Sequence, residues 1–83
     1  MTCYVYVLGC TELGKAVTYV GWTTELERRL EQHNAGSGAR TTRGRNWVLI
    51  YAEKHDSQIS AMSREWHLKR DRTFRKMLRE NGT

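Results

Sequence analysis

Residues 3–10 read Cys-Tyr-Val-Tyr-Val-Leu-Gly-Cys, and this run is apolar on both of its alternating faces. Successive side chains of an extended segment point in opposite directions, so both faces must be covered by other parts of the chain. The run therefore predicts the central strand of a sheet. A chain of 83 residues buries only about 60% of the surface that its unfolded form exposes, which is enough for one core. We expect a single domain over residues 1–83.

The next segments predict a hairpin followed by a helix. Residues 11–16 contain a glycine and read as a hairpin connection, and residues 17–22 (Val-Thr-Tyr-Val-Gly-Trp) read as the returning strand. Thr24 and Glu27 have the spacing of a capping box, which predicts that a helix starts here. Gly36 is a favoured residue just after a helix, so we expect this helix to end there.

The second half of the chain predicts one more strand and two more helices. Residues 36–45 are polar, basic and glycine-rich, which indicates a loop, and residues 47–52 read as the third strand. A second helix is expected over residues 57–70, and a third helix is expected to be capped by Thr73. The predicted fold belongs to the α/β class in its α+β form. It is a three-stranded, largely antiparallel sheet flanked by three helices, in the order strand–strand–helix–strand–helix–helix.

The composition points to an anionic partner. Lys and Arg outnumber Asp and Glu by 14 to 9, so the net charge is +5, which favours nucleic acid as the partner. The alternative is a solvated helix face on a basic protein. No window approaches the roughly 20 apolar residues of a membrane helix, and the N-terminus lacks a targeting pattern, so we expect a cytoplasmic protein without a membrane partner. Cys3 and Cys10 are too few for a disulfide framework.

Polar side chains fall on or beside the apolar stripes of two predicted helices. On the first helix, Arg29 and His33 lie at the edge of the stripe formed by Leu26 and Leu30. On the second helix, Glu65 falls inside an apolar arc, where a carboxylate is costly unless it is paired or binds a metal. The alternative for Glu65 is a structural ion pair with Lys69 or Arg29. The arc of about 180° comprises Ile59, Ala61, Met62, Trp66 and Leu68.

Taken together, these residues resemble the GIY-YIG nuclease superfamily. Its first motif matches loosely at Tyr4-Val5-Tyr6, where Tyr4 replaces the glycine of the family name, and its second matches at Tyr19-Val20-Gly21. Arg29 and His33 follow on the next predicted helix, and Glu65 lies on a later one. The match spans about residues 3–70. The chain most closely resembles the short stand-alone members, and it also resembles the nuclease subunits of structure-specific endonucleases that cut branched DNA.

The resemblance implies an endonuclease that hydrolyses DNA phosphodiester bonds with a divalent metal ion, Mg²⁺ or Mn²⁺. It implies that Glu65 binds the metal and that Tyr6 or Tyr19 is the general base. Arg29 is suited to clamp the phosphoryl oxygens, because a guanidinium donates two parallel hydrogen bonds. His33 is expected to assist proton transfer or to contact a phosphate. The residues expected to contact DNA phosphates are Arg40, Arg43, Arg45 and Lys69.

Two other interpretations compete with this one. The first is a non-catalytic nucleic-acid-binding module, and the second is a nuclease subunit that is inactive without a partner protein. We expect DNA, including branched or single-stranded forms, as the substrate, recognised by its structure rather than its sequence. Trp22 and Trp47 are expected to be core residues rather than platforms for unpaired bases.

Overall fold

The computed structural model describes residues 2–12, 14–36 and 45–81. Three strands, β1 (Cys3–Glu12), β2 (Lys15–Thr23) and β3 (Val48–His55), form one sheet in the order β2-β1-β3. Both pairings are antiparallel. β1 is the central strand, as its two apolar faces predicted. β2 is therefore an edge strand whose outer side is not paired within this sheet.

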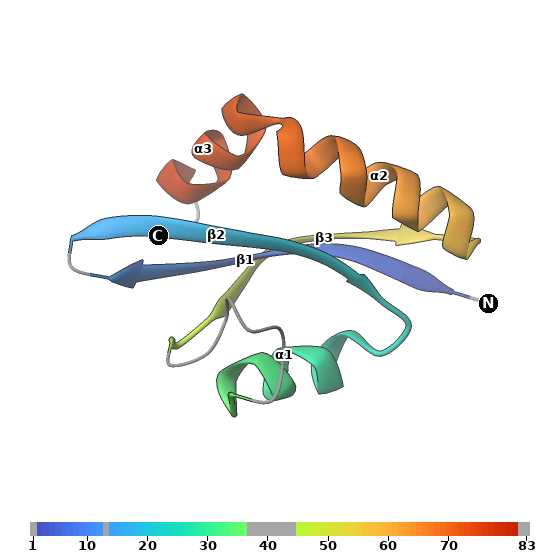
Figure 1. Cartoon of the computed structure of the whole chain (residues 1–83), viewed down its shortest axis with the longest axis horizontal. Coiled ribbons are helices and arrows are strands. Elements are labelled where there is room, and N and C mark those ends of the chain that lie inside the picture. Colours follow the sequence, from blue (N-terminus) through green and yellow to red (C-terminus); the bar gives the residue numbers. More distant parts are fainter. Residues whose placement is uncertain (1, 13, 37–44, 82–83) are drawn as a thin grey trace.

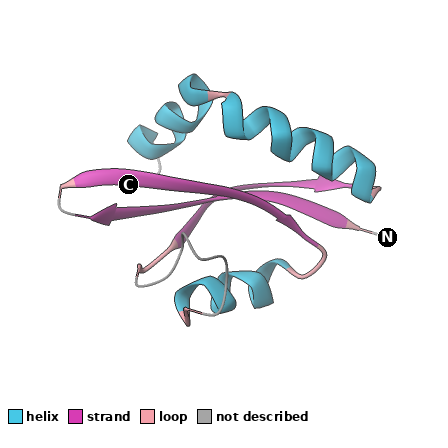
Figure 2. Ribbon diagram, viewed as in Figure 1, coloured by secondary structure: helices cyan, strands magenta, loops and turns pink. Residues whose placement is uncertain are grey.

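Three helices cover the two faces of the sheet. They are α1 (Leu26–Asn34), α2 (Gln58–Arg70) and α3 (Arg72–Asn81), and the predicted element order is confirmed. Figure 1 shows α2 and α3 on one face and α1 on the other. The same three-layer arrangement is clear when the chain is coloured by secondary structure (Figure 2).

Alternation along β1 builds a separate core on each face. Cys3, Val5 and Val7 are fully buried and belong to the core beneath α2 and α3. Tyr6 and Leu8 are buried between them in sequence but belong to the core beneath α1. Both cores therefore depend on the same strand, which explains why the run at residues 3–10 lacks a polar face.

The predicted start of α1 is wrong. The N-cap position is Glu25, which makes no side-chain capping hydrogen bond, so Thr24 and Glu27 do not form a capping box. Instead, the Glu25 N–H donates to Thr23 Oγ1 over 3.1 Å. β2 extends as far as Thr23 and leaves a turn before the first helical residue, so the N-cap falls one residue later than a Thr24 cap would place it.

Of the other predicted helix boundaries, those at Gly36, Ser57 and Arg70 agree with the structure, and the cap of α3 does not. Gly36 has a φ of +83° just after α1, in the left-handed region that favours glycine. Ser57 caps α2 and accepts a hydrogen bond from the Ser60 N–H. Thr73 does not cap α3, because Asp71 Oδ1 accepts from the Phe74 N–H over 3.0 Å and takes that role two residues earlier.

The apolar arc predicted for α2 is wrong for three of its five residues. Ala61 and Leu68 are buried, but Ile59, Met62 and Trp66 are exposed. A helix lying on a sheet buries only a stripe at spacings of three and four residues, and tertiary packing determines which stripe that is. The guanidinium of Arg70 stacks over Trp66 instead, 3.7 Å from the ring centroid. The stripe that faces the sheet consists of Ala61, Arg64, Glu65 and Leu68.

A polar network fixes α2 on β3. Glu53 accepts a hydrogen bond from Arg64 Nε at 2.8 Å, and its carboxylate also bonds to Tyr51 and His55. His55 in turn lies 2.6 Å from Ser60 Oγ, in the first turn of α2. Burial alone would raise the pKa of Glu53, but the hydrogen bonds from its three partners outweigh burial and lower that pKa. Because Arg64 precedes Glu65, this network also fixes the orientation of Glu65.

None of the described helices is long and apolar enough to cross a membrane. Cys3 is buried and Cys10 is half-buried, and the two are not joined in a disulfide.

We predict that Glu53→Gln lowers the free energy of unfolding by about 1–3 kcal/mol at pH 7, because Arg64 loses a charged acceptor. Glu53 has a lowered pKa in the folded state, so its stabilisation is present above the unfolded pKa and is lost as pH falls through the folded pKa. Urea unfolding at pH 7 and pH 3 therefore should show a smaller difference from wild type at the lower pH. The control is Glu27→Gln on an exposed position of α1. Equal effects of both variants at pH 7 would contradict the role of the network.

Candidate active site

Gly21 allows a tyrosine from the central strand to reach the edge of the sheet. Tyr6 on β1 pairs with Gly21 on β2. A Cβ atom at Gly21 would lie 2.5 Å from Tyr6 Oη and 2.7 Å from Tyr6 Cζ, closer than real Cβ atoms approach other atoms. The Tyr6 side chain therefore lies across Gly21, with its phenol oxygen over the edge strand.

The phenol of Tyr6 meets an imidazole from α1. Tyr6 Oη lies 3.0 Å from His33 Nε2, and both residues are almost completely buried. The ring of Tyr19 on β2 packs on His33 with a centroid distance of 4.9 Å and lies 6.4 Å from the Tyr6 ring. Two strands and one helix thus bring Tyr6, Tyr19 and His33 into one aromatic cluster beneath β2.

The local environment keeps both members of the pair uncharged at neutral pH. Burial raises the pKa of Tyr6 to about 12, and the nearby Tyr19 and Glu65 act in the same direction, while Arg29 opposes them. Burial and the charge of Arg29 lower the pKa of His33. A neutral phenol and a neutral imidazole share one hydrogen bond, in which Tyr6 O–H donates when His33 carries its proton on Nδ1.

Arg29 lies one turn before His33 on α1 and is half-buried. Its guanidinium donates to Gln32 Oε1 over 3.1 Å, and its hydrogen bond and charge are the influences that lower the Tyr6 pKa against burial. The arginine therefore places a fixed positive charge beside the phenol, with further N–H donors in a planar fork.

Glu65 approaches the same edge from α2, on the opposite face of the sheet. Its side chain is 22% exposed, and its Oε1 lies 3.3 Å from Lys69 Nζ. Its negative charge contributes to the raised pKa of Tyr6, so the carboxylate lies within electrostatic range of the phenol. The ion pair with Lys69, which the sequence left open as an alternative, is present.

The donor set at this edge fits Mg²⁺ better than a closed metal site. The described residues contain no group of three or more His, Cys, Asp or Glu side chains that is able to hold a metal. Mg²⁺ is commonly held by one or two carboxylates together with substrate phosphate and water, which Glu65 alone can satisfy.

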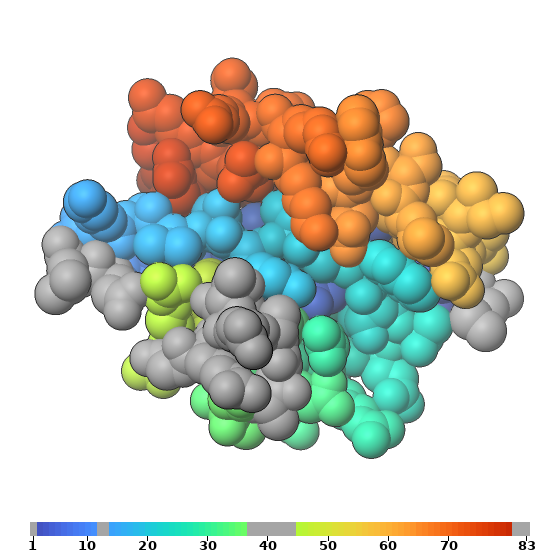
Figure 3. All heavy atoms as spheres, in the orientation of Figure 1, coloured from blue at the N-terminus to red at the C-terminus, as the bar shows by residue number. Residues whose placement is uncertain are grey.

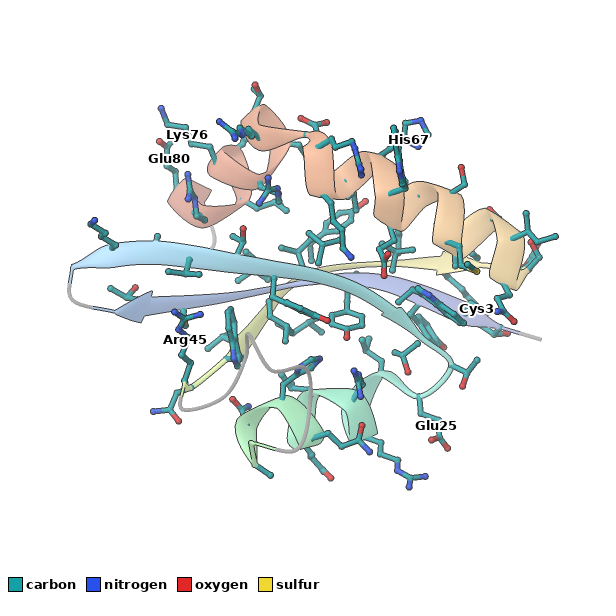
Figure 4. The ribbon with its side chains drawn as sticks, in the orientation of Figure 1. Cys3, Glu25, Arg45, His67, Lys76 and Glu80 are labelled. Carbon is teal, nitrogen blue, oxygen red and sulfur yellow. The ribbon has the colours of Figure 1, made fainter. Side chains whose placement is uncertain are left out.

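Of the residues expected to contact DNA phosphates, Arg45 and Lys69 belong to the part of the chain that the structure describes, and Lys69 pairs with Glu65. Arg45 lies over Trp47, with its Cζ 5.9 Å from the ring centroid, beneath the hairpin half of the sheet (Figure 4). Trp47 is buried and packs on Tyr19, which confirms it as a core residue. Trp22 is partly buried against the opposite core. Arg40 and Arg43 lie outside the described residues.

Asn34 is a supporting residue that the sequence did not reveal. Its Nδ2 donates to the Trp47 carbonyl over 3.1 Å, and its Oδ1 accepts from the Trp47 N–H. These two bonds join the end of α1 to the chain just before β3 and fix the helix that carries Arg29 and His33. A single asparagine at the end of a helix is not part of any periodic pattern in the sequence. Its position directly after His33 was the only sign of a role near the site.

Comparison with known proteins agrees with this geometry. The GIY-YIG catalytic domain family matches residues 2–78. The chain belongs to the GIY-YIG family. This membership places it among nuclease domains, as the motifs at Tyr6 and Tyr19 predicted.

Relatives of similar length share the same domain. The chain is 48% identical to the UPF0213 protein of Natronomonas pharaonis over 67 residues, covering 80% of this chain and 75% of that protein. It is 43% identical to the UPF0213 protein of Haloquadratum walsbyi over 82 residues, covering 96% and 89%. The solution NMR structure of the UPF0213 protein from Bacillus halodurans is similar, with a TM-score of 0.53 and 34% identity, covering 99% of this chain and 87% of that one.

We predict that His33 makes folding sensitive to mild acid. Its pKa is lowered in the folded state, so below about pH 6.5 the unfolded chain binds the proton and the folded chain does not. Stability should fall with decreasing pH, by at most about 1.4 kcal/mol per pH unit for this one proton. Thermal unfolding between pH 7 and pH 5 should show a smaller slope for His33→Gln than for wild type. His67→Gln, on an exposed position of α2, serves as the control. An unchanged slope in His33→Gln would contradict the assignment.

Proposed function

We propose that this protein is a divalent-metal-dependent endonuclease that hydrolyses DNA phosphodiester bonds and is guided by DNA structure rather than sequence. The observation that carries the proposal is the buried hydrogen bond between Tyr6 and His33, with Arg29 and Glu65 both close enough to shift the pKa of the phenol. A module that only binds nucleic acid gains nothing from a carboxylate beside a phosphate, because the two negative charges repel. Family membership supports the same activity.

Arg29 would bind and polarise the scissile phosphate. Its guanidinium is permanently charged and presents donors in a fork that matches two phosphoryl oxygens. Negative charge grows on those oxygens as water attacks, so a fixed cation there stabilises the transition state more than the ground state. The half-buried position of Arg29 strengthens this effect, since less water screens the charge.

Tyr6 and His33 would act together to accept a proton from the attacking water. A phenol with a pKa of about 12 carries almost no phenolate at neutral pH, so it needs a partner to receive its own proton. His33 Nε2 lies 3.0 Å away and is neutral. As the water oxygen bonds to phosphorus, its proton passes to Tyr6 Oη and the phenol proton passes to His33. The bond from phosphorus to the leaving oxygen breaks, and that oxygen takes a proton from solvent. Tyr19 would position the imidazole through ring packing.

Glu65 would hold the metal ion, which when bound neutralises charge on the phosphate and on the leaving oxygen. Lys69 pairs with this carboxylate in the absence of metal and DNA, and its long side chain is half exposed. When substrate arrives, Lys69 is free to move to a neighbouring phosphate. One carboxylate then suffices, because substrate phosphate supplies further oxygen ligands.

Recognition by structure follows from the type of contact available. Arginine and lysine contacts to phosphates position a duplex but carry no base sequence information. We therefore assign branched or single-stranded DNA as the substrate class, with Arg40, Arg43 and Arg45 as backbone contacts.

The test is incision of supercoiled plasmid and labelled branched DNA at low salt, with Mg²⁺, Mn²⁺ or EDTA. Wild type should cut only with metal, and Glu65→Ala should lose at least about 100-fold in rate. Glu27→Ala removes an exposed carboxylate from α1 and should cut like wild type.

Equal DNA binding by wild type and Glu65→Ala without cutting by either would reject the stand-alone enzyme. Cutting that appears only after addition of a partner protein would support the partner-dependent subunit instead.

A further inference from the structure

Three arginines of α3 converge on one hollow outside the tyrosine cluster. Arg72, Arg75 and Arg79 follow one another at spacings of three and four residues and thus share one side of the helix. They are the residues that line a hollow of about 200 Å³. Guanidinium groups keep their charge at any physiological pH, so three of them around one space repel each other unless an anion lies between them.

Neutral groups hold two of these arginines in place. Arg75 Nη1 donates to Thr18 Oγ1 over 3.2 Å, and its Nη2 donates to the Lys69 carbonyl over 2.9 Å. Arg79 Nη1 donates to the Ala16 carbonyl over 3.2 Å. These acceptors orient the guanidinium groups without cancelling their charge. Among the described residues, Arg75 Nε is the buried side-chain polar atom that lacks a hydrogen-bond partner.

The position of Arg72 also points away from a structural role. It is the first residue of α3. A cation at the N-terminal end of a helix opposes the helix dipole and weakens the helix. Folding therefore does not account for a positive charge at this place, whereas anion binding does.

We propose that the hollow between Arg72, Arg75 and Arg79 binds a backbone phosphate of the nucleic-acid substrate, on one arm beyond the cleavage site. The identity of the ligand rests on the function proposed above. The shared chemistry is that of a phosphate group, which a free phosphate ion also has. The hollow belongs to a longer basic surface, because Arg79 also lines the next hollow, of about 430 Å³, together with Lys15, Ala16, Lys76 and Glu80.

The register of β2 gives the distance between this site and the catalytic residues. Thr18 and Ala16 lie three and five residues before Gly21, which is about 10–17 Å along a strand at roughly 3.3 Å per residue. Each nucleotide of a duplex strand advances about 3.4 Å along the helix axis. The α3 hollow would therefore hold a phosphate about three to five nucleotides from the scissile bond. Figure 3 shows α3 (red) directly above the hairpin half of the edge strand β2 (blue).

The experiment measures binding separately from cutting. All proteins carry Glu65→Ala so that substrate stays intact, and fluorescein-labelled branched DNA is the probe, with anisotropy recorded between 50 and about 200 mM salt. The test variant is Arg72→Gln with Arg79→Gln. The charge-matched control is Arg28→Gln with Lys54→Gln, two exposed positions on α1 and on β3, the strand at the opposite edge.

We expect the test variant to bind more weakly and to lower the slope of log K against log salt by roughly 0.9 for each phosphate that it no longer binds. Shortening one DNA arm from ten to about two base pairs should weaken DNA binding by the parent protein but not by the test variant. Its melting temperature should change little, because Arg72 at the start of α3 opposes the helix dipole whereas Arg79 in the last turn favours it. An equal weakening of binding in the charge-matched control would overturn the site in favour of a general charge effect.

Two further arms separate the remaining outcomes. In the first, inorganic phosphate is titrated into ¹⁵N-labelled protein and the shifts of the α3 amides are followed. Saturable shifts of these amides, together with unchanged DNA binding by the test variant, would overturn the nucleic-acid assignment. If active wild type cuts DNA and the test variant binds it normally, this inference fails and the proposed function stands. If wild type cuts nothing but the test variant alone loses DNA binding, the phosphate site stands and the proposed function fails.

Discussion

The missing Cβ at Gly21 is the constraint on which the site depends. Tyr6 belongs to the central strand and would otherwise be confined to the core beneath α1. A Cβ atom at Gly21 would lie only 2.5 Å from the phenol oxygen. Because Gly21 lacks this atom, the phenol oxygen lies over the edge strand while the ring stays buried. Its hydrogen bond to His33 and its electrostatic coupling to Arg29 and Glu65 all depend on this passage.

The edge strand also lies between the two helices that contribute to the proposed site. A sheet normally separates side chains above it from those below, and α1 and α2 lie on different sides of this one (Figure 1). β2 has no neighbour on its outer side within the sheet, and the charge of Glu65 on α2 contributes to the raised pKa of the Tyr6 phenol on the other face. The network around Glu53 and the clamp from Asn34 to Trp47 keep the two helices in place.

The sequence predicted most of the fold because the strongest signal lay in the central strand. No local pattern in the sequence identifies Tyr6 as the group that needs the space left by Gly21. The predicted start of α1 was wrong because Thr23 accepts a hydrogen bond in the turn before the helix. The predicted buried face of α2 was wrong because packing on the sheet determines which stripe is covered, and that stripe includes Glu65. The alternating residues of β3 likewise gave no sign that Glu53 binds Arg64 on a later helix.

The most direct test of this account is the incision rate of Gly21→Ala. The added methyl should displace Tyr6 and lower the rate roughly 100-fold, the usual cost of misplacing a reacting group by about 1 Å, while DNA binding persists. Gly9→Ala is the matched control, since the three atoms nearest to its Cβ belong to the side chain of Ile50, the closest at 3.2 Å. Combining Gly21→Ala with Tyr6→Phe should reduce the rate little beyond either change alone. If Gly21→Ala cuts as fast as Gly9→Ala, the passage of Tyr6 across Gly21 is not what builds the site.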